Sequence, residues 1–184
     1  MRSMLDQLRQ LAEPIKRLSA AEANKLAEAQ AERLLRLSGV TEPPVAENVI
    51  ARLPNIQIER IDAPKDFQAA ARWSSGRWVI LVNSGMTRAS QRFSVAHELK
   101  HILDHPFVMI MYARRPPELA HEVCEYFAAC LLMPRRWVRA AWAEGVRDER
   151  TLARRFGVTV EALKVRLLQL GLIKPTALCL TREA

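Results

Sequence analysis

The sequence predicts an α+β fold in which helices surround one small antiparallel sheet. Two changes in the spacing of apolar residues support this prediction. Residues 3–38 are rich in Leu, Ala, Glu, Gln and Arg, with apolar residues at helical spacing. From residue 55 to residue 83 apolar and polar residues largely alternate, as they do on one face of a strand, and helical spacing returns after residue 87. With 184 residues, 49% of them hydrophobic, the chain is long enough to bury a full core.

Proline, glycine and polar turn residues set the boundaries of the predicted elements. We expect one or two helices over 3–38, bent near Pro14, and a short helix over 45–53. Strands follow near 56–61, 67–73 and 77–83, the last two joined by a hairpin turn at Ser74-Ser75-Gly76. Further helices are predicted over 88–104, 118–133, 136–143, 149–156 and 160–170. We therefore divide the chain into an N-terminal helical segment (1–44), a core (45–134) and a C-terminal helical region (135–184).

The predicted helix 88–104 carries an H-E-x-x-H motif, formed by His97, Glu98 and His101. Residues four apart lie on the same helix face, so both imidazoles can bind one zinc ion at about 2.0 to 2.1 Å. Glu98 is next to the first ligand and can act as general base on a water molecule at the metal. His105 lies eight residues from His97, about 12 Å along the helix axis, and is too far to share that ion. The motif predicts a zinc metallopeptidase with one ion per chain.

A second motif, Phe127-Ala-Ala-Cys-Leu-Leu-Met-Pro134, ends the next long helix. With both motifs in this order, the chain resembles the ImmA/IrrE metallopeptidases, best over 51–134 and more weakly to residue 172. The resemblance implies a zincin-like domain with zinc-dependent endopeptidase activity. It also implies a protein substrate, a helix-turn-helix transcriptional repressor, cleaved in a stress or mobile-element response.

The third zinc ligand is the point at which this sequence departs from the resemblance. The family usually has a Glu six residues before the Phe that matches Phe127, and here that position holds His121. Either His121 is the ligand, which gives three imidazoles, or Glu122 or Glu125 reaches the metal. His121 and Glu125 share a helix face, whereas Glu122 points about 100° away. We favour His121, with Glu125 holding a ligand imidazole in place.

Two predictions concern how the site holds its substrate. An exposed strand beside the metal can bind an extended peptide by strand addition, and we assign this role to Val79, Leu81 and Asn83. The alternative is a buried strand, because residues 79–82 are apolar on both faces. Tyr112, in the loop before the second motif helix, is a candidate for stabilising the oxyanion, although a lone tyrosine there also suits packing.

The region 151–167 has helix-turn-helix spacing, with Gly157 in the turn and Thr159 as N-cap of the second helix. We expect that helix to present Glu161, Lys164 and Arg166 outward. The formal charge of +8 also suits an anionic partner. The alternative function is thus a non-catalytic regulator that binds DNA or a repressor through these helices. DNA binding is not favoured, because the second helix is mainly aliphatic and recognition helices present polar side chains to base edges.

The sequence indicates a cytoplasmic protein without a membrane partner. Residues 1–10 contain no apolar run of signal-peptide length, and no stretch approaches the roughly 20 apolar residues that cross a bilayer. The three cysteines, Cys124, Cys130 and Cys179, are an odd number without framework spacing, which favours reduced thiols.

Overall fold

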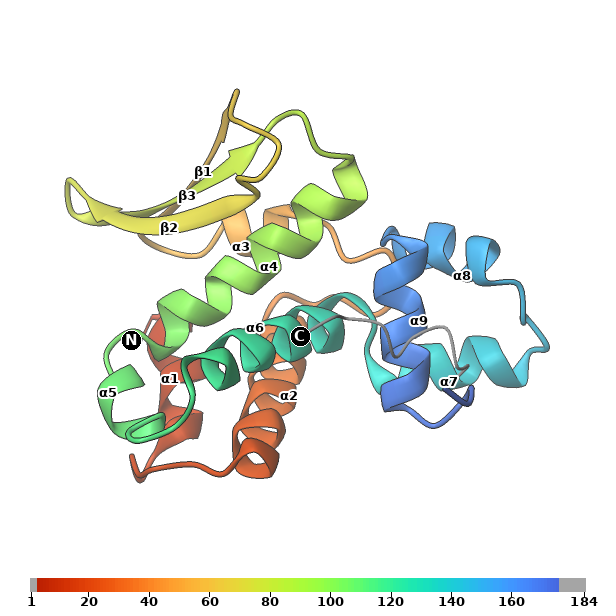
Figure 1. The fold of residues 1–184 in the computed structure, drawn as a ribbon, viewed down its shortest axis with the longest axis horizontal. Helices are drawn as coiled ribbons and strands as arrows, with labels where there is room; N and C mark the ends of the chain where they lie inside the picture. The colour runs from red at the N-terminus through yellow and green to blue at the C-terminus, as the bar shows by residue number, and fades with distance from the viewer. Residues whose placement is uncertain (1–2, 176–184) are drawn as a thin grey trace.

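Residues 3–175, which the computed structural model describes, form helices around one three-stranded sheet, and the predicted α+β class is confirmed (Figure 1). The N-terminal part contains α1 (Met4–Arg9), the 3-10 helix η1 (Gln10–Ala12), α2 (Ala20–Leu37) and α3 (Asn48–Ala51). The sheet consists of β1 (Ile56–Ile61), β2 (Ala69–Ser74) and β3 (Arg77–Asn83). The remaining helices are α4 (Arg88–Asp104), α5 (Val108–Met111), α6 (Pro117–Leu132), α7 (Arg135–Ala143), α8 (Glu149–Phe156) and α9 (Val160–Gln169).

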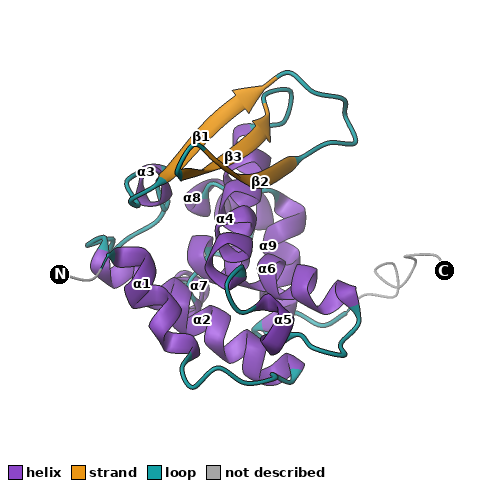
Figure 2. Cartoon of the chain, turned by 90° about the vertical axis from the view of Figure 1, so that its left-hand side faces the viewer, coloured by secondary structure: helices purple, strands orange, loops and turns teal. Residues whose placement is uncertain are grey.

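The sheet is mixed, so the prediction of a purely antiparallel sheet is wrong in this respect. Its strand order is β1-β3-β2, with β2 antiparallel to β3 and β1 parallel to β3. After β1 the chain crosses through residues 62–68 before it enters β2, so that β3 returns between the two earlier strands (Figure 2). The central position of β3 leaves β1 and β2 as the edge strands.

The hairpin between β2 and β3 forms at the turn that the sequence indicated. Its two central residues, Ser75 and Gly76, have φ values of 49° and 78°. Positive φ at both positions is the geometry of a type I′ turn, whose twist matches that of the flanking strands. Ser74 therefore pairs with Arg77, and the register that follows places Ala71 opposite Ile80.

Helix α4 lies between the sheet and the remaining helices, packing against β2 and β3 on one side and α6 on the other (Figure 1). It begins after Thr87, whose hydroxyl accepts a hydrogen bond from the N–H of Ser90. At its other end the Arg9 guanidinium donates to the carbonyls of Ile102 and Leu103 at 2.9 and 3.4 Å. Both ends of this helix are thus fixed by polar contacts, which holds its side chains in a defined position relative to α6.

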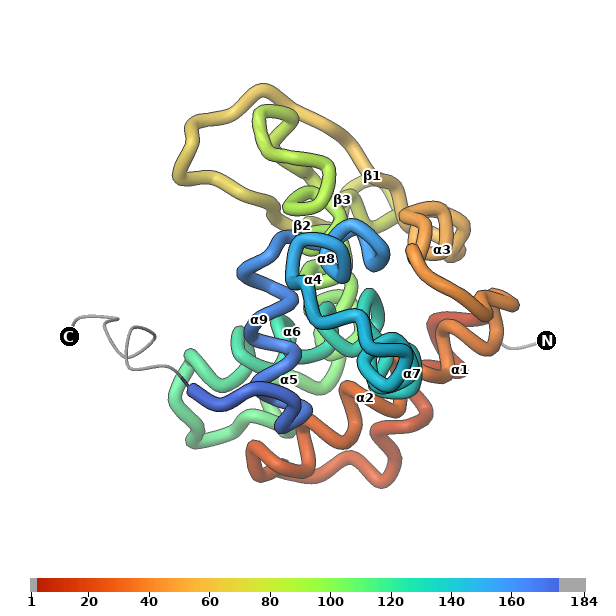
Figure 3. The backbone as a smooth tube through the Cα atoms, turned by 90° about the vertical axis from the view of Figure 1, so that its right-hand side faces the viewer, coloured from red at the N-terminus to blue at the C-terminus, as the bar shows by residue number. Residues whose placement is uncertain are grey.

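One continuous cluster of buried apolar residues includes members from 1–44, 45–134 and 135–184, for example Leu34, Leu99, Phe127 and Leu163. Helix α2 packs along α6, and α9 contacts α6 near its C-terminal end. Figure 3 shows α7, α8 and α9 grouped together on the side that faces the viewer, and Figure 1 places this group beyond one end of α6. The C-terminal helices therefore share the core that positions the two motif helices.

The C-terminal helices α8 and α9 are joined by Gly157, whose φ of 65° ends α8 in the left-handed conformation. Arg166, predicted to face outward on α9, is instead completely buried, and its Nε donates to the carbonyl of Met133 at 3.1 Å. Lys164 is exposed but forms an ion pair with Glu149 at 3.1 Å. The prediction for Arg166 is wrong because the end of α6 offers a carbonyl that a buried guanidinium can satisfy.

Two of the three cysteines, Cys124 and Cys130, are buried free thiols, as predicted. Burial raises the pKa of the Cys130 thiol to about 11, so this side chain stays protonated near neutral pH. Cys179 lies outside the described residues. Within residues 3–175, no helix has the length and apolar composition needed to cross a membrane.

Candidate metal centre

The H-E-x-x-H segment lies in the middle of α4, where helical geometry brings His97 and His101 to the same face. Their Nε2 atoms are 3.1 Å apart and their ring centroids 4.9 Å apart. Both residues precede the end of the helix at Asp104, so a regular turn separates them. The motif therefore places two imidazole nitrogens side by side, as the sequence predicted.

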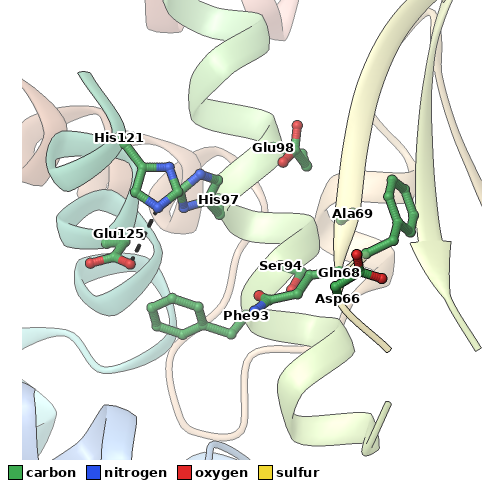
Figure 4. Close-up of a pocket in the computed structure, with 10 residues that line it drawn as sticks. Asp66, Gln68, Ala69, Phe93, Ser94, His97, Glu98, His121 and Glu125 are labelled. Carbon is green, nitrogen blue, oxygen red and sulfur yellow. Dashed lines mark ion pairs between the residues drawn. The ribbon is translucent and has the colours of Figure 1, made fainter. Parts of the chain in front are cut away.

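Helix α6 contributes a third imidazole from His121. Its ring centroid lies 4.5 Å from that of His97, and the two side chains point toward each other from neighbouring helices (Figure 4). One ligand nitrogen from each of His97, His101 and His121 lies within 4.8 Å of the others. The structure thus brings together the three residues that we favoured as ligands.

The two glutamates considered as alternative ligands occupy different positions. Glu125, one turn after His121, lies with its Oε1 3.5 Å from His121 Nε2, an ion-pair distance when that ring is protonated (Figure 4). Its carboxylate is thus placed to orient the ring. Glu122 is not among the residues whose donor atoms cluster, and it lines a neighbouring groove instead. Its position follows from the rotation of about 100° per helical residue.

The donor set fits a zinc ion. Two nitrogens bound to one tetrahedral zinc at about 2.0 to 2.1 Å are about 3.3 Å apart. The 3.1 Å separation of the Nε2 atoms of His97 and His101 is close to this value. Three protein imidazoles with one open position form the donor set of catalytic rather than structural zinc sites. The side chains of His97, His101 and His121 would hold the ion.

Burial and mutual repulsion keep the first two imidazoles in the neutral form that binds metals. Burial, together with the neighbouring His101 and His121 rings, lowers the pKa of His97 to about 3. Burial, and then His121, also lowers the pKa of His101. Burial instead raises the pKa of Glu98, against an opposing hydrogen bond from the backbone of Ala71 and the nearby His121. A carboxylate with a raised pKa is a stronger base near neutral pH.

The side chains of His97, Glu98 and His121 line a pocket of about 420 Å³. Its lining includes residues that sequence reasoning missed, namely Asp66, Phe67, Gln68, Ala69, Phe93 and Ser94. The signal for Phe93 and Ser94 was available, because they lie four and three residues before His97 and so share its helix face. Residues 66–68 of the crossing loop and Ala69 of β2 had no such signal, because they are distant from α4 in the sequence and approach it only in the folded chain.

The residues predicted to bind substrate, Val79, Leu81 and Asn83, do not lie at an open edge. They belong to β3, which is hydrogen-bonded to β1 on one side and to β2 on the other. Asn83 is buried, and its side-chain amide donates to the carbonyls of Ala63, Pro64 and Phe67 at 2.8–3.2 Å. Strand addition at β3 is therefore excluded. Asn83 instead fixes the crossing loop that lines the pocket.

The strand beside the pocket is β2. Asn83 N–H donates to the carbonyl of Gln68 at 2.9 Å, so Gln68 faces β3. Because antiparallel pairing alternates between bonded and non-bonded residues, Ala69, Ala71 and Trp73 direct their backbone N–H and C=O groups away from β3. The contact between the Ala71 backbone and the Glu98 carboxylate agrees with this assignment. An open strand edge thus passes directly beside the predicted general base.

Tyr112 does not reach this pocket. Its hydroxyl is buried and donates to Asp104 Oδ2 at 2.6 Å, while Lys100 Nζ lies 2.5 Å from Asp104 Oδ1. Burial, together with Asp104, strongly raises the pKa of this phenol. The predicted role as oxyanion stabiliser is contradicted, because the donor is committed to a buried carboxylate. Its function in this fold is to complete the polar network of Lys100 and Asp104.

An α+β fold with an H-E-x-x-H helix and a third imidazole from a neighbouring helix defines the class of zincin-type metallopeptidases. Residues 51–168 match the Peptidase_M78 family, described as the IrrE N-terminal-like domain. The chain belongs to this metallopeptidase family, as the two sequence motifs predicted. The match extends through α8 and most of α9, so the C-terminal helices are part of the family domain.

Among solved structures, the chain resembles a Mycobacterium tuberculosis transcriptional regulator, with a TM-score of 0.63 and 21% sequence identity. The alignment covers 90% of this chain and 52% of that one, so this chain spans about half the length of its structural relative. At this identity the likeness supports the fold alone. Comparison with curated proteins finds no match.

Proposed function

We propose that this chain is a zinc-dependent endopeptidase that acts in the cytoplasm on a protein substrate. The observation that carries the proposal is the cluster of three imidazoles beside Glu98, with His97, Glu98 and His121 lining one pocket next to an open strand edge. Neither the H-E-x-x-H helix nor the exposed edge by itself indicates an endopeptidase. Together they provide a ligand set, a base and a place for an extended peptide.

The bound metal would supply Lewis acidity toward the scissile carbonyl and a lowered pKa for water. The chain's own residues do the rest. Glu98 takes the proton from the attacking water and returns it to the departing amine nitrogen, a dual role that its raised pKa favours. The outward N–H and C=O groups of Ala69 and Trp73 hold the substrate backbone as an added strand. Glu125 keeps the His121 ring in its binding orientation.

For the biological substrate we propose a helix-turn-helix transcriptional repressor, cleaved in a stress or mobile-element response. The family match supports a peptidase, and the structural relative is described as a transcriptional regulator. The alternative, a DNA-binding regulator, has less support. Arg166 is buried, and Lys164, although exposed, is paired with Glu149, so neither of the two bases on which that interpretation depended is a free outward charge.

The experiment is cleavage of a mixed peptide library by the zinc-loaded protein, with products identified by mass spectrometry. Glu98→Gln is expected to slow cleavage by about 10²- to 10⁴-fold, the contribution typical of a general base, while zinc content stays unchanged. Glu118→Gln, which changes an exposed glutamate at the start of α6, is the matched control and should cleave like wild type. Cleavage that survives in Glu98→Gln would refute the mechanism.

A further inference from the structure

A second groove, of about 910 Å³, continues from the metal pocket. The two share Gln68, Phe93, Ser94 and Glu125 in their linings. The groove is bounded by α4, α6 and α9, with the crossing loop and the start of α2 at its margins. A peptide held at the metal can therefore extend into it without leaving the protein surface.

The floor of this groove is apolar, and its charged residues are mostly acidic. Apolar contacts come from Phe93, Leu119, Val123, Tyr126, Val165 and Leu168. Among the described residues, Glu122, Glu125 and Glu161 line the same groove together with one base, Lys65, and Asp66 lines the adjoining metal pocket. On a chain with a formal charge of +8, this concentration of acidic residues is opposite in sign to the molecule as a whole.

Three acidic residues at the groove and the adjoining metal pocket have no lysine or arginine partner among the described residues, whereas Glu125 lies 3.5 Å from His121. Within residues 3–175, Asp66, Glu122 and Glu161 form no ion pair with a lysine or arginine. Elsewhere on the surface several glutamates do, for example Glu144 with Arg155 and Glu149 with Lys164. Their negative charge is thus available to a bound partner at the exposed surface of the groove.

We propose that this groove binds a basic, amphipathic segment of the protein substrate adjacent to the scissile bond. The inference rests on the proposed function, because it takes the occupant to be the peptide that the metal pocket cleaves. Apolar side chains of that segment pack on the floor, and its lysines or arginines face Glu122 and Glu161. Helix α9 thereby acts as a substrate-contacting wall, which gives a role to Val165, a large apolar side chain that is 52% exposed.

The test measures binding rather than cleavage, so that it can fail independently of the proposed function. The full-length Glu98→Gln protein, loaded with zinc, is titrated against three fluorescein-labelled peptides of equal length by fluorescence anisotropy. All three carry the same leucines, and their polar positions are lysine, glutamine or glutamate. The lysine peptide is expected to bind about tenfold more tightly than the glutamate peptide at low ionic strength, with the difference shrinking as salt is added.

Variants locate the effect within the groove. Glu122→Gln and Glu161→Gln should each weaken the lysine peptide by about two- to fivefold, the range of one exposed charge pair, and leave the glutamine peptide unchanged. Glu32→Gln, an exposed residue of α2 that does not line the groove, is the matched control and should change neither.

Equal affinity for the three peptides, or an equal loss in Glu32→Gln, would overturn the inference. So would tighter binding of the glutamate peptide than of the lysine peptide, which would make the groove an anion site. Binding that disappears at concentrations where the chain self-associates would identify a second copy as the occupant and would also overturn it. A charge preference without any library cleavage would support the groove while counting against the peptidase.

Discussion

Replacement of Arg166 by alanine is expected to lower the free energy of unfolding by about 3 kcal/mol, although the sequence predicted an outward-facing side chain at this position. Its side chain is completely buried, donates to the Met133 carbonyl at 3.1 Å and lies over the Tyr126 ring at 5.5 Å. It therefore connects α9 to the end of α6, the helix that carries His121.

The magnitude follows from these contacts. A hydrogen bond from a charged donor contributes about 2 kcal/mol, and the ring contact adds about 0.5 to 1 kcal/mol. Removal of two buried methylene groups costs about 1.6 kcal/mol more. The Nη2 atom of Arg166 is buried and lies 3.9 Å from Glu28 Oε1, too far for a hydrogen bond, and relief of that incomplete pairing returns about 1 kcal/mol. In a chain of this size the net loss corresponds to a fall in Tm of about 6 to 12 °C.

Urea unfolding of the metal-free protein, followed by circular dichroism, measures the effect. The matched control is Lys164→Ala on the same helix, which removes one exposed ion pair with Glu149 and should cost less than about 1 kcal/mol. If Arg166→Ala and Lys164→Ala lose the same stability within about 1 kcal/mol, Arg166 does not act as this structural link and the reasoning is wrong.

Three further predictions follow from the geometry. Because the pKa of His97 is lowered from 6.5 to about 3, the unfolded chain binds more protons between these values, and metal-free protein should lose stability as pH falls from 6.5 toward 3. Urea titrations should show a weaker pH dependence of the free energy of unfolding in His97→Gln than in wild type, and equal slopes would contradict this. Ala69→Pro removes an outward N–H from β2 and should raise KM for a peptide by about two- to tenfold. Ala70→Pro instead removes a hydrogen bond between β2 and β3 and should unfold the sheet. Equal behaviour of the two variants in cleavage and circular dichroism would refute the assignment of β2 as the open edge. Gly157→Ala places a side chain at a φ of 65° against the Arg92 guanidinium and should cost at least about 1 kcal/mol in urea unfolding, so an unchanged midpoint would count against that turn geometry.

Local signals in the sequence predicted the elements that carry the site. Helix α4 begins and ends at the predicted residues, because Thr87 caps it and Pro106 follows closely after its end. The β2–β3 hairpin was predictable for the same reason, since Ser75 and Gly76 form the turn between its strands. The spacing of His97 and His101 likewise required only the helical repeat.

Long-range contacts explain what the sequence did not reveal. The pairing of β1 with β3, rather than with the next strand in the chain, depends on how residues 62–68 cross the sheet. This pairing decides that β2 and not β3 offers the open edge. The burial of Arg166 depends on the Met133 carbonyl, 33 residues earlier in the chain, and the pattern of α9 alone gives no sign of it.

The third ligand lies between these cases. The resemblance to the family indicated position 121, where this chain has a histidine instead of the usual glutamate. The helical repeat then placed Glu122 on a different helix face from His121 and Glu125. Which of the remaining two faces His97 depends on the packing of α6 against α4, and the structure places the His121 ring 4.5 Å from that of His97.

The central claim, that His97, His101 and His121 hold one zinc ion, is tested most directly by metal content. Protein purified without chelator or histidine tag is measured by inductively coupled plasma mass spectrometry, as wild type and as His97→Ala, His121→Ala and Glu122→Gln. We expect near-stoichiometric zinc in wild type and Glu122→Gln, with strong loss in both histidine variants. Zinc that remains stoichiometric in His121→Ala, or a wild type that does not take up added zinc, would contradict the proposed site.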